Sequence, residues 1–112
     1  GFFFTDDITP PGEDLIAKGL TAKESSGVIK KSIEILATLP DVLVETAEPI
    51  MREYVETSGY SAGQVFGIMR MAITGQKVSP PLFESMEIIG REKVLARLQK
   101  ALELLESLPG QE

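Results

Sequence analysis

The stretch FGIMRMAITGQKVSPPL, residues Phe66–Leu82, decides the fold, because one helix ends inside it and the next is expected to begin in it. Its apolar residues recur at three- and four-residue spacing, which places them on one helix face. Gly75 follows this run and can adopt the left-handed conformation that closes a helix. Ser79 then precedes two prolines, and a serine cap with proline in the first turn predicts a new helix here. The apolar residues at this spacing are Val65, Phe66, Met69, Ala72 and Ile73.

Three polar residues gather at this predicted helix–loop–helix corner: Arg70, Lys77 and Ser79. A cation beside the backbone donors of a helix start suits an anion or a nucleic-acid base. An ordinary helical corner with a solvated Arg70 and Lys77 is the more common explanation of such spacing. The corner alone therefore does not decide the function.

Helix-start and helix-stop signals predict two helices before this stretch. Thr21–Glu24 has the capping-box sequence TAKE, which begins the first helix, and this helix is expected to end before Pro40. Thr46 is expected to cap the second helix, with Pro49 in the first turn, where a missing N–H is harmless. Gly59 is expected to end it.

Three more helices complete the prediction. Ser61 caps a third helix that runs to Thr74, and a short fourth helix begins near Leu82 and ends at Gly90. A leucine-rich fifth helix is expected over residues 92–107. Because no alternating strand pattern occurs, the sequence predicts an all-α bundle of about five helices.

The chain is expected to form one domain over residues 1–112, with an irregular leading segment at 1–20 and a helical part at 21–108. The three adjacent phenylalanines Phe2–Phe4 require a neighbour to cover them, so the chain is interpreted as a fragment of a larger protein. It has no apolar run long enough for a membrane span and no signal-peptide pattern.

Composition excludes several kinds of site. The chain has no histidine and no cysteine, which removes the usual general base, serine triads, thiolate sites and most zinc sites. A glycine-rich phosphate loop is also absent. We therefore predict no catalytic residue, no metal site and no cofactor in this chain.

Charge is unevenly distributed along the chain. Residues 1–60 carry eleven acids and five bases, whereas residues 61–112 carry six of each, which together give the net charge of −6. An acidic chain argues against strong non-specific binding to a polyanion. It leaves room for a local site in the neutral second half.

Residues 63–103 carry a set of ordered motifs. These are Arg70–Gly75 (RMAITG), Ser79–Phe83 (SPPLF) and Ile89–Glu92 (IGRE). In this order and spacing they resemble the C-terminal anticodon-binding domain of bacterial-type glutamyl-tRNA synthetase. The resemblance implies an all-helical cage of the class I synthetase type that holds the anticodon of glutamate tRNA.

The resemblance also implies roles for single residues. Arg70 and Leu82 match family positions near the first anticodon base, and Ser79 and Pro80 match positions near the middle base. Many family members have threonine at the position of Ser79, so here the hydroxyl is kept and the methyl group is lost. Candidate phosphate contacts are Lys77, Arg91, Lys93 and Arg97, although a solvated helix face explains them equally well.

For the parent protein, the resemblance implies an ATP-dependent glutamate–tRNA ligase that uses ATP and magnesium outside this chain. The expected partners are glutamate tRNA and the preceding domains of the same chain, in a cytoplasmic monomer without membrane contact. Two alternatives stay open: a helical protein-interaction module that docks through Phe2–Phe4, and a small carboxylate enzyme, for which the acids show no paired cluster. The sequence does not say whether the parent also charges glutamine tRNA.

Overall fold

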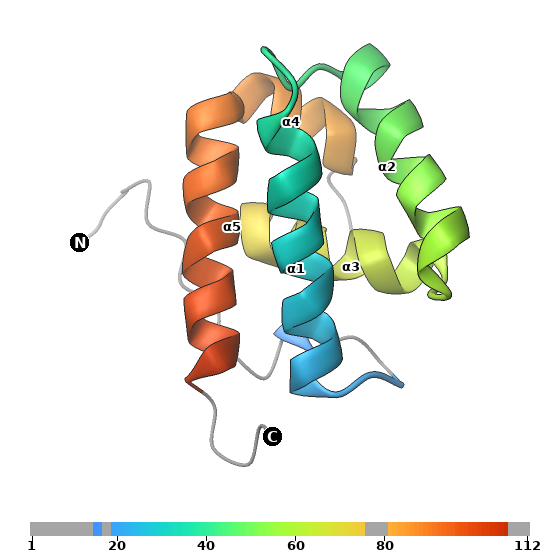
Figure 1. Ribbon diagram of the computed structural model, residues 1–112. Helices are drawn as coiled ribbons and strands as arrows, with labels where there is room; N and C mark the ends of the chain where they lie inside the picture. Colours follow the sequence, from blue (N-terminus) through green and yellow to red (C-terminus); the bar gives the residue numbers. More distant parts are fainter. Residues whose placement is uncertain (1–14, 17–18, 76–80, 108–112) are drawn as a thin grey trace, which may run out of the picture.

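The computed structural model describes residues 15–16, 19–75 and 81–107, and within these ranges all regular structure is helical. Five helices follow one another: α1 (Ala22–Ala37), α2 (Val44–Ser58), α3 (Ala62–Thr74), α4 (Leu82–Ile89) and α5 (Arg91–Glu106) (Figure 1). The prediction of an all-α domain of about five helices is confirmed.

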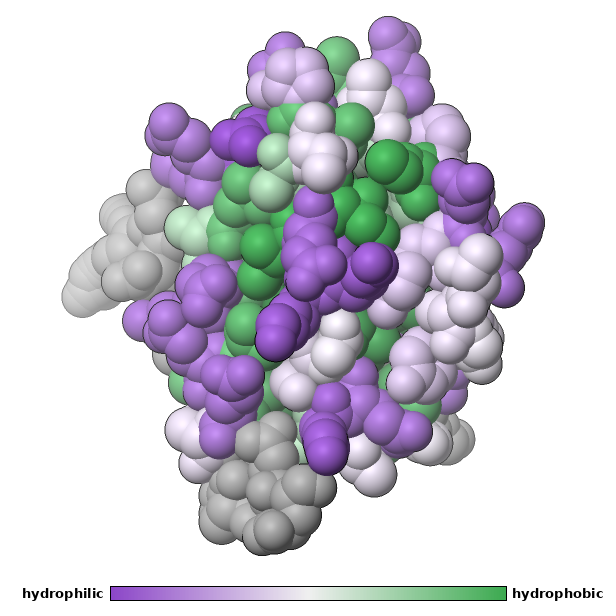
Figure 2. Space-filling model, viewed as in Figure 1, coloured by the Kyte–Doolittle hydropathy of each residue, from purple (hydrophilic) through white to green (hydrophobic). Residues whose placement is uncertain are grey.

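Helices α1 and α5 form the centre of the packing. They lie side by side and run in opposite directions, and they share the most extensive contact of any helix pair (Figure 1). Helix α3 crosses behind α1 and also packs against α5, while α4 contacts α2, α3 and α5. The same view by hydropathy shows hydrophilic residues on the outer sides of the helices and hydrophobic ones between them (Figure 2). Fully buried side chains include Ile29 and Leu36 of α1, Met69 and Ile73 of α3, Met86 of α4, and Leu98 and Leu105 of α5.

Two helix starts are capped as predicted. The Thr21 hydroxyl accepts from the Glu24 N–H at 3.1 Å, and the Glu24 carboxylate accepts from the Thr21 N–H at 2.9 Å. Ser61 and Gln64 exchange the same pair of hydrogen bonds at the start of α3, at 3.1 and 3.0 Å. Each reciprocal pair satisfies two backbone donors that the helix itself leaves unpaired.

The predicted start of α2 is wrong by three residues. The helix begins at Val44, and the Thr46 hydroxyl accepts from the N–H of Leu43, the residue that precedes the helix, at 3.1 Å. Leucine has no side-chain acceptor, so the start of α2 takes one from another helix. A carboxylate oxygen of Glu87 in α4 accepts from the Val44 N–H at 2.9 Å. An acid at a helix N-terminus also complements the helix dipole.

Because α2 begins early, Pro49 lies inside the helix and not in its first turn, contrary to the prediction. Proline has no N–H, so the carbonyl four residues earlier, at Glu45, loses its helical donor. Both residues are exposed, and water can satisfy that carbonyl.

Helix α4 begins at Leu82, as predicted, but one detail of its start differs. Pro81 precedes the helix and does not lie in its first turn. The predicted cap Ser79 lies outside the described residues. At the other end, Gly90 separates α4 from α5 with a φ of 98°, a value that favours glycine, as the sequence predicts.

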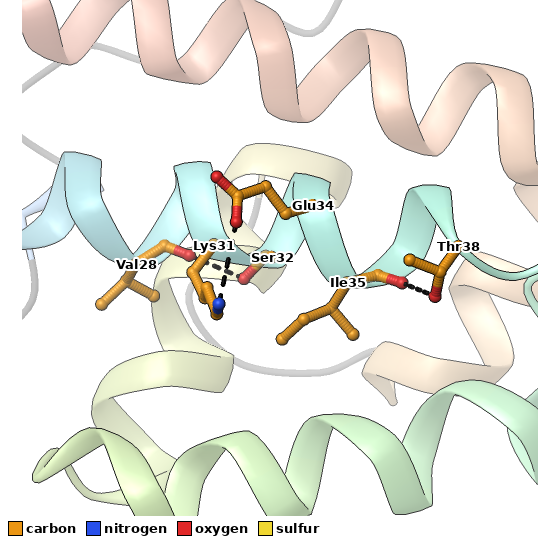
Figure 3. A network of polar contacts seen from close by, with 6 residues as sticks. All are labelled: Val28, Lys31, Ser32, Glu34, Ile35 and Thr38. Atoms are coloured by element: carbon orange, nitrogen blue, oxygen red, sulfur yellow. Dashed lines mark hydrogen bonds and ion pairs between the residues drawn. The ribbon is translucent and has the colours of Figure 1, made fainter.

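Helix α1 buries a serine without leaving its hydroxyl unpaired. Ser32 is fully buried, and its hydroxyl donates to the Val28 carbonyl one turn back at 2.8 Å (Figure 3). At the end of the helix, the hydroxyl of the exposed Thr38 donates a similar hydrogen bond to the Ile35 carbonyl. The Lys31–Glu34 ion pair on this helix is exposed, and such pairs stabilise a fold little.

No helix in the described ranges is long and apolar enough to cross a membrane.

Candidate nucleic-acid interface

The corner between α3 and α4 is the candidate interface, and its first side is the end of α3. Arg70 lies in the last turns of this helix and is half-buried. Its carbonyl accepts from the Thr74 hydroxyl at 2.7 Å. Gly75 then ends the helix at φ 77°, and its N–H donates to the Met71 carbonyl at 2.9 Å. The predicted glycine stop is confirmed, and it fixes the backbone that carries Arg70.

The second side of the corner is the start of α4, which is anchored in the core. Phe83 packs edge-on against Phe66 of α3, with ring centroids 5.2 Å apart and an angle of 86° between the planes. The Arg52 guanidinium of α2 lies 5.5 Å from the Phe66 ring centroid, in a cation–π arrangement. Aromatic contacts therefore join α2, α3 and α4 beside the corner.

Leu82 is also part of the core, with only 3% of its surface exposed. Its predicted role as an apolar surface for the first anticodon base stays a prediction. The other predicted residues of the corner, Lys77, Ser79 and Pro80, lie outside the described residues. Their roles stay predictions as well.

Two of the candidate phosphate contacts lie against helix ends. Arg97 donates from Nη1 to the Ile73 carbonyl in the last turn of α3 at 2.8 Å. Arg91 donates from Nε to the Leu39 carbonyl at 2.8 Å and from Nη2 to the Ala37 carbonyl, at the end of α1, at 3.0 Å. Carbonyls at a helix C-terminus lack helical donors, and a cation there complements the helix dipole. Lys93, the third candidate described, is exposed.

Replacing Arg91 with methionine should lower the free energy of unfolding by about 1.5–3 kcal/mol, because two charge-assisted hydrogen bonds to carbonyls are lost. Urea unfolding of the 112-residue chain measures this loss. Lys100→Met, at an exposed position of the same helix, is the matched control and should change stability by less than about 0.5 kcal/mol. Equal losses in both variants would show that the Arg91 bonds contribute nothing specific.

Other features of the described residues do not point to catalysis. A surface hollow of about 450 Å³ lies between Pro40 and the start of α5, and its lining carries two acids, Asp41 and Glu92, and two bases, Arg91 and Lys93. This balance of charge does not select an anion. No group of three or more metal-binding side chains occurs among the described residues. Burial, and to a lesser extent the nearby Tyr60, raises the pKa of Tyr54 above its ordinary value of 10.0.

Sequence reasoning missed the residues that connect distant helices, chiefly Glu87 as a cap for α2 and the two arginines as donors to α1 and α3. Their partners lie 24 to 54 residues away, so no local spacing indicates them. What spacing did indicate was the corner itself, through its glycine stop and the arginine before it.

Comparison with known proteins identifies the family. Residues 1–102 match the family described as "Anticodon binding domain". The chain belongs to this family of anticodon-binding domains. That match covers the α3–α4 corner and most of α5.

Similarity to curated proteins named glutamate–tRNA ligase supports this family assignment. A glutamate–tRNA ligase of Moorella thermoacetica is 43% identical over 100 residues, which are 89% of this chain and 20% of that protein. A glutamate–tRNA ligase of Dehalococcoides mccartyi is 36% identical over 110 residues, or 98% of this chain and 23% of that protein. A third, glutamate–tRNA ligase 2 of Thermosipho melanesiensis, is 36% identical over 93% of this chain and 22% of its own length. The chain thus spans about a fifth of the length of these relatives, and no solved structure matches it.

Proposed function

We propose that this chain binds the anticodon loop of glutamate tRNA and that the α3–α4 corner is its contact surface. The observation that carries the proposal is the match of nearly the whole chain to relatives named glutamate–tRNA ligase, within a family of anticodon-binding domains. Anticodon bases are unpaired, and proteins read RNA sequence most readily where bases are splayed out of a helix.

The chemistry of the corner supports this surface. Arg70 offers a planar fork of donors that can meet two acceptors on one base edge. Arg70 is half-buried, and hydrogen bonds from Thr74 and Gly75 hold the backbone of the last turn of α3. The backbone position from which the guanidinium extends is therefore well defined. We assign the first anticodon base to Arg70 and Leu82, and the middle base to Ser79 and Pro80.

The distribution of charge over the described helices also favours RNA binding on the side of the domain that includes α3. Helix α2 carries four acids against one base, Arg52, which is itself paired with Glu48 at 2.9 Å. Helices α3 and α5 together carry five bases against three acids, all on α5; the bases are Arg70, Arg91, Lys93, Arg97 and Lys100. RNA should therefore approach the α3–α5 side and avoid the outer face of α2. The candidates that we propose for phosphate contact are Lys93 of α5 and Lys77, which follows α3 in the sequence.

We further propose that the longer protein is an ATP-dependent glutamate–tRNA ligase. ATP and Mg²⁺ would act in a part of it that lies outside this chain, and this chain would supply recognition alone. Such a protein works with the translation machinery, so we place it in the cytoplasm as a monomer whose preceding domains contact this one.

Equilibrium binding to short RNAs tests the proposal. The 112-residue chain should bind the anticodon stem-loop of glutamate tRNA weakly, and should bind more weakly still when the first anticodon base is changed. Fluorescence anisotropy at one fixed salt concentration measures both affinities, since RNA affinity depends strongly on salt. A hairpin with the same stem and an unrelated loop is the control. Equal affinity for all three RNAs would reject anticodon recognition.

A further inference from the structure

We infer that Arg97 is a positioning residue for anticodon reading: it holds the end of α3, and thereby Arg70, and does not contact RNA phosphate. The inference rests on the proposed function. It concerns a residue whose position in the sequence is equally compatible with a phosphate contact or a solvated helix face.

The geometry begins with the carbonyls that end α3. The last four carbonyls of a helix have no helical donor and require other partners. The Met71 carbonyl accepts from the Gly75 N–H. The Ile73 carbonyl belongs to a fully buried residue, and its donor is Arg97 Nη1 at 2.8 Å. A side chain from α5 thus completes the end of α3.

The guanidinium of Arg97 is directed into the protein. The Nε atom of Arg97 is buried, and within the described part of the chain it has no hydrogen-bond partner. An N–H withdrawn from water in this way costs free energy, which the charge-assisted bond to Ile73 offsets. The bond to Ile73 occupies one of the five guanidinium donors and burial withdraws Nε, so fewer donors remain for a phosphate.

The Ile73 carbonyl, which Arg97 binds, lies about one helical turn from Arg70. Ile73 lies three residues after Arg70, and the Thr74 hydroxyl returns to the Arg70 carbonyl at 2.7 Å. Helix ends fray when their terminal groups are unpaired. Loss of the Arg97 bond should loosen this last turn and move the backbone of Arg70. A two-pronged arginine contact tolerates little displacement, so discrimination between bases should fall even though Arg70 is unchanged.

Three variants test the inference in the 112-residue chain: Arg97→Met, Arg97→Gln and Arg97→Lys. The measured quantity is the ratio of two dissociation constants, for the stem-loop with an altered first anticodon base and for the native stem-loop. We expect Arg97→Met and Arg97→Gln to lower this ratio by at least about 5-fold. Arg97→Lys should regain part of it, because lysine supplies one charged donor to Ile73. Lys100→Met, an exposed cation one turn further along α5, should leave the ratio unchanged.

The salt dependence of binding separates the two roles. A phosphate contact contributes about 0.7 to the slope of log K against log salt on a single strand, and its loss weakens both RNAs equally. We expect the slope in Arg97→Met to equal that of the wild type. A slope lower by about 0.7 with an unchanged ratio would overturn the inference, and so would an unchanged ratio with an unchanged slope. Far-UV circular dichroism checks folding, and if Arg97→Met does not fold, Arg97→Gln is interpreted by the same criteria.

The inference and the proposed function fail in different ways. A wild-type chain that does not distinguish the two stem-loops contradicts the proposed function before any variant is made. A wild-type chain that does distinguish them, with a ratio unaffected by Arg97→Met, rejects only the role of Arg97.

Discussion

Replacing Ile29 with alanine should lower the free energy of unfolding by about 2–5 kcal/mol. Ile29 is 0% exposed and lies on α1, the helix that packs against α5, α3 and α2. The substitution removes buried methyl groups and leaves a cavity that the surrounding helices fill only in part. Domains of this size are stable by roughly 5–15 kcal/mol, so the loss is a large share of the total.

Ile88→Ala is the matched control, because the residue type and the helical setting are the same while the burial is opposite. Ile88 of α4 is 85% exposed, so its removal takes little apolar surface out of the core. Alanine also favours helix slightly more than isoleucine does, and the net change should stay within about 0.5 kcal/mol. Urea unfolding with linear extrapolation measures both variants, at an unchanged m-value. Comparable losses in the two variants would contradict the core placement of α1.

The features predicted correctly from the sequence depend on neighbours in the chain. The caps at Thr21 and Ser61 each need a partner three residues later, and the glycine stop at Gly75 needs only a backbone that tolerates positive φ. Spacing within one turn is visible in sequence letters. These signals therefore placed α1, α3 and the α3 side of the corner.

The features missed from the sequence depend on the tertiary fold. Thr46 was predicted to be a helix cap because threonine is common at that position, yet it is the third residue of α2 and its hydroxyl accepts from the N–H of the residue before the helix. The carboxylate of Glu87, which supports the start of α2, arrives from a helix more than 40 residues further along. Arg91 and Arg97 looked like surface cations for the same reason: the carbonyls that they bind are distant in sequence.

In the candidate site, too, the features set by neighbours in the chain were predicted and those set by the tertiary fold were not. The motif around Arg70 correctly placed an arginine in the last turns of a helix that ends at Gly75, whereas its half-burial was not predicted. The burial of Leu82 could not be predicted, since an apolar residue at the start of a helix has the same spacing whether it faces the core or a ligand. The role of Leu82 in contacting a base comes from the family resemblance, because its burial in the structure indicates only a place in the core.

Arg70→Ala should reduce discrimination at the first anticodon base in the full-length ligase proposed above. A bidentate contact between arginine and a base provides about 1–3 kcal/mol of discrimination in groove recognition, which we carry over to RNA. On that scale, the ratio of kcat/KM between native glutamate tRNA and a tRNA altered at that base should fall by roughly 5- to 150-fold. Both tRNAs are measured at one salt concentration, because salt changes their affinity strongly.

Arg70→Lys is the informative companion variant, because it keeps the positive charge and removes the planar fork. If Arg70 reads a base, lysine should lose most of the discrimination, as alanine does. If Arg70 neutralises a phosphate, lysine should act almost like arginine, and alanine should weaken both tRNAs equally with a salt slope lower by about 0.7. An alanine variant with an unchanged rate on both tRNAs would leave Arg70 as a half-buried residue of α3 without a role in recognition, and the contact surface would then have to lie away from this corner.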